Sequence, residues 1–549
     1  MNLNSFLFFI LFFSYSAFGQ NIETTEINIL EDFTPKIVDG KKINDRAEYH
    51  DSLSSDRLQK YEFFEFTLQS NYKTKLLAPA TIKAPLLTKL YSNSICFGFG
   101  NYWKTKADII YNSTRSINKS YGIHFHHYSD KYLPAKNSKN SMNAFYKRIY
   151  SSNIYKINLS YNRRTAFYEQ NRSSLIKENF RNRFALTKLS LNIYSNKNIN
   201  NRVNHNTNIF ISDFNEFSEN HFHASSKIRN LFKNLPITIR TRFDSYLNYN
   251  SNSSSFKSSN VNYFDFSPNY ALNKYDIDMS LGFNFVFKSL GSNFYLMPNV
   301  KFSKELVKDI IIIETGFLQS HIKNSLQRIS AINPYIHSYG MNQSIDDADK
   351  FNQTLNFTKE NKFYFSLRNI LSENEILKTS FGYSSIYNFM HFIRFDNPSY
   401  SRYVSNYIDL SQYNLDVEYF NKINSLLSLE FTCGIYKWNK EVFNKPSFKC
   451  DLQTPIALRK KINIIPSILY YSKKRFVASS INQIATPYVF QIDQEVGPYL
   501  YVNLLLEYNY SKYLSAFLNF YNITNNTQDL WLGYDEQGLN ILFGIRTSF

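Results

Sequence analysis

Two short motifs each place a pair of histidines on one face of a predicted strand. They are His124-Phe125-His126 and His221-Phe222-His223. Because alternate residues of a strand share a face and each residue rises about 3.3 Å, the two imidazoles of a motif lie about 7 Å apart along the chain. That spacing can chelate a metal ion, but no carboxylate or cysteine stands beside either pair at ligand spacing. We therefore interpret these histidines, His124, His126, His221 and His223, as polar lining of an interior, and only as weak metal candidates.

A group of charged residues lies on two further predicted strands. Arg240 and Arg242 occupy the polar face of a strand at 236–247. A ring of such cations could select anions in a pore. We favour the alternative that they form an ion-pair network with Asp276 and Asp278, which lie on the polar face of a strand two segments away. Either way, these four side chains are predicted to line a lumen.

Sequence motifs for catalysis are missing. There is no Gly-x-Ser-x-Gly and no His-Glu-x-x-His, and Gly98-Phe99-Gly100 falls within a predicted strand rather than a phosphate-binding loop. A dispersed Ser–His or Asp–His arrangement cannot be detected by spacing, so a hydrolase remains a third alternative. We predict a protein that is not an enzyme, with no catalytic residues and no cofactor.

The elements that would hold these side chains are strands of period two. The alternation begins at Leu90 and continues to the end of the chain, and it is clearest at 276–287. There, one unbroken apolar face comprises Ile277, Met279, Leu281, Phe283, Phe285 and Phe287. In water such a face needs a second layer, and no helical pattern is available to supply one. Lipid is the simpler cover.

Composition supports a membrane barrel. Aromatic residues make up 17% of the 549 residues, and the mean hydropathy is only −0.38. No apolar run after residue 20 approaches the roughly 18 residues of a membrane helix. In a barrel only alternate residues face lipid, which reconciles these facts. We predict an all-β, antiparallel transmembrane barrel of about 22 strands (range 18–24) over residues 89–549. Long polar loops are expected near 129–141, 248–260, 320–358, 473–497 and 525–538.

The last strand, 539–549, has the same membrane pattern. Its apolar face comprises Ile541, Phe543, Ile545 and the terminal Phe549. Asn540, Gly544, Arg546 and Ser548 share the other face, where Gly544 is paired with the bulky Leu542. We expect this strand to close the barrel and to serve as its assembly signal. The alternative is an ordinary edge strand of a soluble sheet.

The N-terminal part differs from the rest. Residues 1–19 are read as a signal peptide, with an apolar core at 6–13 and a small-x-small cleavage site at 17–19. Residues 20–88 are read as an extended segment in the periplasm or lumen, because prolines such as Pro79 and Pro85 suit an extended backbone. The segment is also too short and too aperiodic for a globular plug domain.

The cysteines exclude two kinds of site, and the net charge bears on the possible partners. Cys96, Cys433 and Cys450 are odd in number and lack a Cys-x-x-Cys spacing, so they are neither a disulfide framework nor a zinc site. The formal charge of +18 suits anionic partners such as lipopolysaccharide, although an AT-rich codon bias would also produce it. We expect no nucleic-acid partner.

Three runs near the C-terminus carry a family resemblance. They are 521–525 (Tyr-Asn-Ile-Thr-Asn), 531–535 (Trp-Leu-Gly-Tyr-Asp) and 538–541 (Gly-Leu-Asn-Ile). With them, the chain resembles outer-membrane barrels of the Bacteroidetes related to TonB-dependent receptors. The run 33–39, followed by 89–91 and 98–102, looks like the segment that leads into the first strand of plugless members. The resemblance implies outer-membrane lipid and lipopolysaccharide around the barrel, and the barrel assembly machinery as a partner.

Two functions therefore compete. The favoured one is a plugless, receptor-like outer-membrane barrel that passes or binds solutes, its lumen partly filled by the N-terminal segment. The alternative is a structural, assembly or secretion component whose long loops, 320–358 and 473–497, dock a surface lipoprotein.

Overall fold

The computed structural model describes the barrel part of the chain, which belongs to the unit Leu86–Phe549. The predicted signal peptide at 1–19 and the extended segment at 20–88 lie outside the described residues. Described are residues 90–549 except 115, 117, 133–134, 168–180, 197–202, 216–217, 230–235, 249–259, 275, 290–293, 337–356, 397–400, 460 and 481–489.

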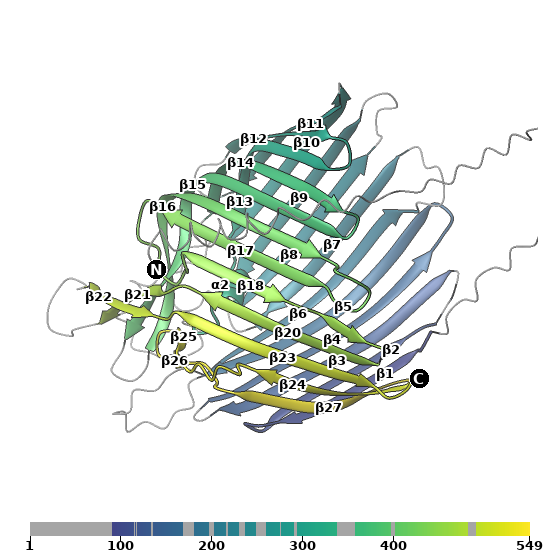
Figure 1. The fold of residues 1–549 in the computed structure, drawn as a ribbon. Coiled ribbons are helices and arrows are strands. Elements are labelled where there is room, and N and C mark those ends of the chain that lie inside the picture. Colours follow the sequence, from purple (N-terminus) through teal and green to yellow (C-terminus); the bar gives the residue numbers. More distant parts are fainter. Residues whose placement is uncertain are drawn as a thin grey trace, which may run out of the picture. The chain divides into compact units, whose positions relative to one another are not determined.

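The first half of the barrel wall is a continuous antiparallel meander (Figure 1). Each strand pairs with the next along the chain, as alternating sequences joined by short turns favour. The strands are β1 (Asn93–Gly100), β2 (Lys104–Asn112), β3 (Lys119–Tyr132), β4 (Ala135–Ile149), β5 (Asn153–Phe167), β6 (Arg181–Ser195), β7 (Asn204–Phe214), β8 (Glu219–Arg229), β9 (Ile237–Asn248), β10 (Val261–Lys274), β11 (Ile277–Lys288) and β12 (Phe294–Val307).

The second half of the wall continues the same meander with small interruptions. Its strands are β13 (Ile311–Lys323), β14 (Phe357–Ser372), β15 (Glu375–Asp396), β16 (Ser401–Asn421), β17 (Leu429–Trp438), β18 (Phe448–Gln453), β19 (Ile456–Leu458), β20 (Ile462–Tyr471), β23 (Tyr499–Asn509), β24 (Leu514–Tyr521) and β27 (Asn540–Ser548). Because β18 and β19 both pair with β20, they form one interrupted strand of the wall. Counted that way, the closed barrel has 22 strands, which confirms the predicted fold class.

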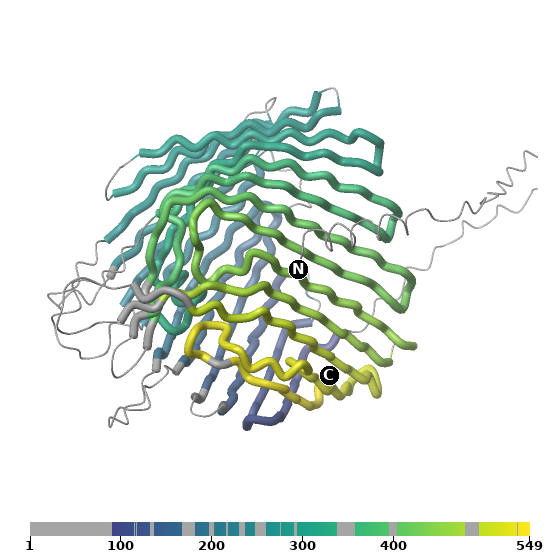
Figure 2. The backbone as a smooth tube through the Cα atoms, turned by 60° about the vertical axis from the view of Figure 1, so that its left-hand side comes forward, coloured from purple at the N-terminus to yellow at the C-terminus, as the bar shows by residue number. Residues whose placement is uncertain are grey.

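The barrel is closed by the last strand. β27 pairs with β24 on one side and with β1 on the other, from Ser94↔Ser548 to Gly100↔Leu542. Figure 2 shows the first and last strands side by side. The backbone amides of Asn93 and Phe549 also exchange hydrogen bonds with each other's carbonyls, at 2.9 and 3.0 Å. Closure leaves no unpaired edge at this seam for lipid to meet.

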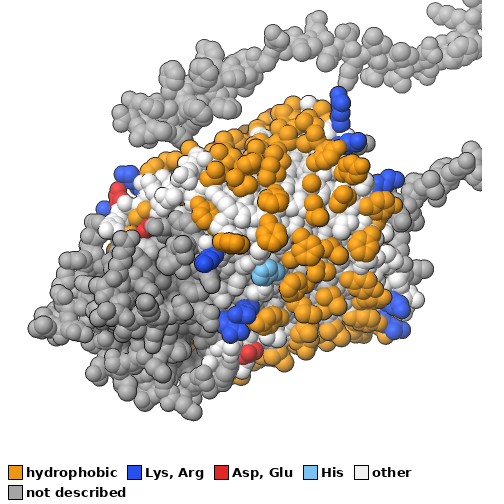
Figure 3. Space-filling model, turned by 90° about the horizontal axis from the view of Figure 1, so that it is seen from below, with side chains coloured by type: hydrophobic (Ala, Val, Ile, Leu, Met, Phe, Trp, Pro, Cys, Tyr) orange, Lys and Arg blue, Asp and Glu red, His pale blue; other side chains and the backbone are white. Residues whose placement is uncertain are grey.

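The outer surface is a wide apolar belt, part of which Figure 3 shows. On β27 the side chains of Phe543 and Ile545 are 59% and 56% exposed, and they point away from the lumen. Other exposed members include Phe97, Phe99, Ile157, Leu159, Leu189, Ile211, Phe283, Phe363 and Phe381. So large an exposed apolar area is stable only against lipid. The protein is therefore an integral β-barrel of the outer-membrane type.

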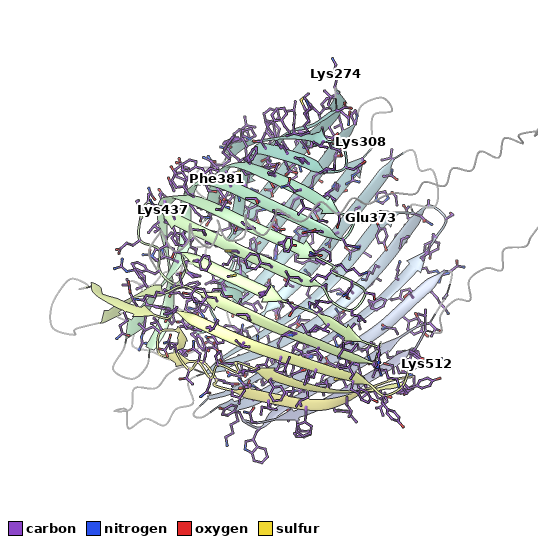
Figure 4. All side chains as sticks on the ribbon, viewed as in Figure 1. Lys274, Lys308, Glu373, Phe381, Lys437 and Lys512 are labelled. Atoms are coloured by element: carbon purple, nitrogen blue, oxygen red, sulfur yellow. The ribbon has the colours of Figure 1, made fainter. Side chains whose placement is uncertain are left out.

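The remaining secondary structure lies at one end of the barrel. The end near the C-terminus carries short turns, where Lys274, Lys308, Glu373 and Lys512 stand in Figure 4. The opposite end, called the loop end below, carries the short helix α2 (Leu326–Ile332) and the strands β21 (Lys474–Ser480), β22 (Phe490–Val496), β25 (Asp529–Trp531) and β26 (Tyr534–Asp535). No helix among the described residues is long and apolar enough to cross a membrane.

One predicted loop is wrong and three others contain regular structure, among them 525–538, which contains β25 and β26. The range 129–141 belongs to β3 and β4, which pair as far as Tyr132↔Ala135. Its residues are polar because the strands extend to the loop end, where neither face requires apolar side chains. The range 473–497 contains β21 and β22, and 320–358 contains the end of β13 and α2.

Candidate functional site

The two histidine motifs lie on the lumen side of β3 and β8. Phe125, between the first pair, is 39% exposed on the outer surface, so His124 and His126 point inward. In β8 the face that carries His221 and His223 also carries Glu219, whose carboxylate accepts hydrogen bonds from the backbone of α2 inside the barrel. The structure thus places all four histidines in the lumen.

Around Asp244 the second pair forms a compact cluster. The Oδ1 atom of Asp244 lies 2.9 Å from Nε2 of His221 and 2.6 Å from Nδ1 of His223. Antiparallel register explains the approach, since His223 on β8 stands directly opposite Asp244 on β9. These side chains are 12%, 13% and 5% exposed. They therefore interact in a largely dry environment.

A lysine and a second carboxylate complete this cluster. Nζ of Lys323 lies 2.7 Å from Oδ2 of Asp244 and 3.0 Å from Oδ2 of Asp265. His321 Nε2 lies 3.3 Å from Asp265 Oδ2. We call His221, His223, Asp244, Asp265, His321 and Lys323 the Asp244 cluster. Its members come from β8, β9, β10 and β13, so only the folded barrel assembles it.

The end of β13 leaves the barrel wall to reach this cluster. β13 pairs with β12 only as far as Asn299↔Leu318, yet it pairs with β14 as far as Lys323↔Phe357. Beyond Leu318 the hairpin therefore continues without β12 and packs against the lumen face of neighbouring strands. There the ring of Phe357 stacks on Tyr263 and Tyr295, at centroid distances of 6.0 and 5.1 Å.

A looser version of the arrangement occurs at the first pair. Oδ1 of Asp108, on β2, lies 2.6 Å from Nδ1 of His126 and 3.4 Å from Nε2 of His124. The register repeats, because His126 stands opposite Asp108 as His223 stands opposite Asp244. However, His124 is 46% exposed, and Lys106 lies 3.6 Å from the carboxylate on the same strand. This triad is open to solvent.

Asp108 and Asp244 are the residues that sequence reasoning missed. Ligand spacing was sought along one strand, but each carboxylate stands on the neighbouring strand. The signal that could have found them is strand register. The strand beside each His-Phe-His run carries a single Asp on its polar face, two residues after a basic residue: Asp108 follows Lys106, and Asp244 follows Arg242. Once strands are paired, that Asp falls opposite the second histidine.

The predicted ion-pair network of Arg240 and Arg242 with Asp276 and Asp278 is wrong. Arg242 lies 3.8 Å from Asp265 on the adjacent strand β10, and Asp278 accepts a hydrogen bond from Asn273. Register is the reason: Arg242 is opposite Asp265, whereas Asp278 is opposite Asn273, eight residues further along β10. At about 3.3 Å per residue, these two positions on β10 lie about 26 Å apart along the strand. Asp278 therefore lies near the end of the barrel that carries the short turns, called the turn end below.

Over the loop end of the lumen lies an apolar cluster, called the mouth cluster. Its members are Phe184, Phe214, Leu326, Ile329, Ile336, Phe392, Tyr403 and Tyr534. They come from β6 and β7, from the α2 segment, from β15 and β16, and from the connection before β27. Because β6 and β16 lie ten positions apart in a wall of 22 strands, the cluster bridges the lumen. Residues 324–336 and 529–537 form its crossing segments.

Specific polar contacts anchor the crossing segments. The Asn182 amide donates to the carbonyls of Pro334 and Ile336 at 2.9 and 2.8 Å. The Glu219 carboxylate, 1% exposed, accepts from the backbone of α2, and Tyr403 donates to the Leu532 carbonyl. The two segments meet where the rings of Tyr335 and Tyr534 stack at 3.6 Å. Buried backbone groups satisfied in this way hold one defined closed arrangement.

Comparison with solved structures identifies the fold. The barrel is similar to the ferric-catecholate import receptor Fiu of Escherichia coli K12 (11% identity, 83% of this chain and 82% of that one, TM-score 0.58). It is also similar to the siderophore receptor PirA of Acinetobacter baumannii (9%, 84% and 81%, 0.60) and the iron transporter FrpB of Neisseria meningitidis (9%, 84% and 82%, 0.61). No protein-family model and no curated protein matches the sequence.

The fold is that of a siderophore-receptor barrel. The similarity agrees with the predicted receptor-like barrel, and at 9–11% identity it concerns the fold alone. What this receptor-like barrel does with its lumen must therefore be argued from its own residues.

At the mouth of the receptor-like barrel, Lys474 is expected to make the stability of the closed β21 hairpin depend on pH. Burial lowers its pKa from 10.5 to about 8; Glu536 opposes the shift and Lys445 adds to it. The rings of Tyr471 and Tyr499 also face its ammonium group, at 5.4 and 4.9 Å. Since the folded-state pKa is the lower one, opening of the β21 hairpin takes up a proton between pH 8 and 10.5. The closed hairpin therefore gains stability as pH rises through that window.

We expect the equilibrium constant for opening of β21 to fall roughly twentyfold between pH 7.5 and 9.5. Amide hydrogen exchange of β21, read as the ratio of wild type to Lys474→Met at each pH, removes the intrinsic pH dependence of exchange. A ratio that stays flat over this range would show that Lys474 is not responsible.

Proposed function

We propose that this protein is a non-enzymatic outer-membrane barrel that passes or binds a small polar solute through its lumen. The observation that carries the proposal is the contrast between the two faces of the wall. The outer face is an apolar belt, whereas the inner face carries charged and amide side chains, among them Lys106, Asp108, Asn414, Asp416 and Glu507. The mouth cluster then covers the loop end of this polar interior. A polar lumen with a defined closure suits controlled passage rather than a purely structural role.

We further propose that the barrel works without a globular plug. Residues 20–88 have the composition of an extended segment, with prolines such as Pro79 and Pro85 in a run that lacks helix or strand periodicity. In this proposal the segment partly fills the lumen. It is the part of the chain that deletion would test directly.

Planar-bilayer recording tests both statements. Purified wild-type protein should show discrete conductance steps, and deletion of residues 20–85 should enlarge them. A heat-dependent gel-mobility shift of each sample provides the control for a folded barrel. Folded barrels that stay electrically silent in both forms, and that bind no solute, would contradict the proposal.

Docking of a surface lipoprotein is the second candidate function. It was predicted from the loops 320–358 and 473–497. The described parts of both loops pack onto the barrel itself: 324–336 crosses the lumen, and β21 pairs in parallel with the end of β15 at Arg394↔Ala478. These contacts favour solute passage as the main function.

A further inference from the structure

We propose that His221, His223 and Asp244 bind a first-row divalent transition-metal ion of the zinc class inside the lumen. The proposal concerns equilibrium binding and stands whether or not the barrel passes solutes. It rests on the geometry of the three side chains, on the groups that fix them, and on a comparison with the similar triad at Asp108.

Three ligand atoms converge on one point. One ring nitrogen from each histidine and a carboxylate oxygen of Asp244 all lie within 4.8 Å of one another. Nε2 of His221 and Nδ1 of His223 are the nitrogens that lie beside Oδ1 of Asp244. In a tetrahedral zinc site with bonds of about 2.0–2.1 Å, neighbouring ligand atoms lie about 3.3 Å apart. The observed N–O distances of 2.9 and 2.6 Å need to open by less than an ångström to admit the ion. A fourth position remains for water or a solute donor, as in zinc sites with three protein ligands.

The surrounding groups already hold the ligands in place. The His221 ring stacks on Tyr246 at 4.1 Å, and the His223 ring stacks on Phe210 at 4.5 Å. Nε2 of His223 lies 3.0 Å from the Ser225 hydroxyl, which can accept the proton of that nitrogen once the Nδ1 lone pair binds the ion. Lys323 bonds to the other oxygen of Asp244 and orients the carboxylate. Partners of this kind are what orient ligands in metal sites.

Charge and donor type select the class of ion. Two imidazoles and one carboxylate suit zinc, cobalt and nickel better than calcium or magnesium, which take six or more oxygen donors. With neutral histidines, the two negative charges of Asp244 and Asp265 are balanced by two positive charges. These are Lys323, which contacts both carboxylates, and Arg242, which lies 3.8 Å from Asp265. The site therefore has no excess of negative charge, so ligand geometry rather than bulk charge must provide the affinity.

The Asp108 triad provides a matched control within the same chain. It has the same residue types and register, but its histidine nitrogens lie 2.6 and 3.4 Å from Asp108, and its side chains are more exposed. Among the described residues, only His221, His223 and Asp244 meet the condition that ligand atoms from three such groups lie within 4.8 Å of one another. We therefore expect binding at Asp244 to be the tighter of the two.

Cobalt titration tests the proposal. Full-length protein, purified in detergent without a histidine tag and stripped with a chelator, is titrated with Co²⁺ and followed by visible d–d absorption. We expect saturation at one equivalent, with displacement by Zn²⁺. The variant H221N/H223N should lose the signal, H124N/H126N should keep it, and Asp244→Asn should weaken binding at least tenfold. The heat-dependent gel shift confirms that each variant is folded.

Two outcomes would overturn the inference. One is the absence of stoichiometric binding to folded wild type. The other is binding that H221N/H223N and Asp244→Asn leave unchanged, or that H124N/H126N abolishes instead. If H221N/H223N fails to fold, the folded Asp244→Asn variant decides alone, since unchanged affinity there contradicts the site.

Discussion

Replacing Gly544 with valine is expected to prevent closure of the barrel, with loss of the heat-dependent folded band and of protein recovered from the outer membrane. A Cβ atom at Gly544 would lie 2.1 Å from the carbonyl oxygen of Phe97 and 2.5 Å from the ring of Phe517. The carbonyl belongs to β1, which Gly544 must approach to form the seam. Because backbone cannot move aside as a side chain can, the clash is relieved only by separating β27 from β1.

Two other substitutions at the seam serve as controls for this result. At Gly98, opposite Gly544, the nearest atom to a new Cβ is the Phe517 ring at 3.0 Å, so Gly98→Ala should be milder. Ser548→Val lies on the same face of β27 and adds the same side chain near the end of the strand, so it should assemble normally. If Gly544→Val gave as much folded protein as wild type in the gel shift, the seam would tolerate a wider spacing and the prediction would be wrong.

Opening the mouth cluster is expected to raise the single-channel conductance severalfold. The double variant Y335A/Y534A removes the two stacked rings where the crossing segments meet, and Tyr534 also belongs to the buried apolar cluster. Truncation of the buried Tyr534 costs about 3–5 kcal/mol, and truncation of the partly buried Tyr335 adds to it, which is more than a local contact between two loop segments can readily absorb. We therefore expect the segments to separate while the hydrogen-bonded wall remains closed.

The measurement is planar-bilayer conductance of the double variant, made with and without residues 20–85. Using both backgrounds separates closure by the mouth from any closure by the N-terminal segment. Tyr508→Ala and Tyr510→Ala, at exposed positions near the turn end, are the matched controls and should leave conductance unchanged. Equal conductance for Y335A/Y534A and wild type in both backgrounds would mean that the mouth cluster does not limit passage.

The signal-peptide and assembly-signal predictions belong to steps before the folded state. Residues 1–19 lie outside the described residues, and Phe549 has a defined place at the seam through its backbone bonds to Asn93. Its role in assembly stays a prediction.

The sequence by itself determined the class of fold, because period-two alternation is a local property that lipid enforces on each strand independently. The strand at 276–287 shows its lipid face without reference to any other residue, and so does the final strand at 540–548. Summed over the chain, such local patterns predicted about 22 strands and an all-β membrane barrel. The same alternation placed both histidine pairs on the side away from lipid.

Only the tertiary structure decided which polar residues meet. Asp244 reaches His223 through strand register, and Lys323 reaches Asp244 and Asp265 through the departure of β13 from β12, so none of these contacts has a fixed separation in sequence. Register also separated Arg242 from Asp278, which the sequence had suggested as partners. The mouth cluster joins β6, α2, β16 and the connection before β27 for the same reason: contacts across a lumen depend on closure of the whole wall.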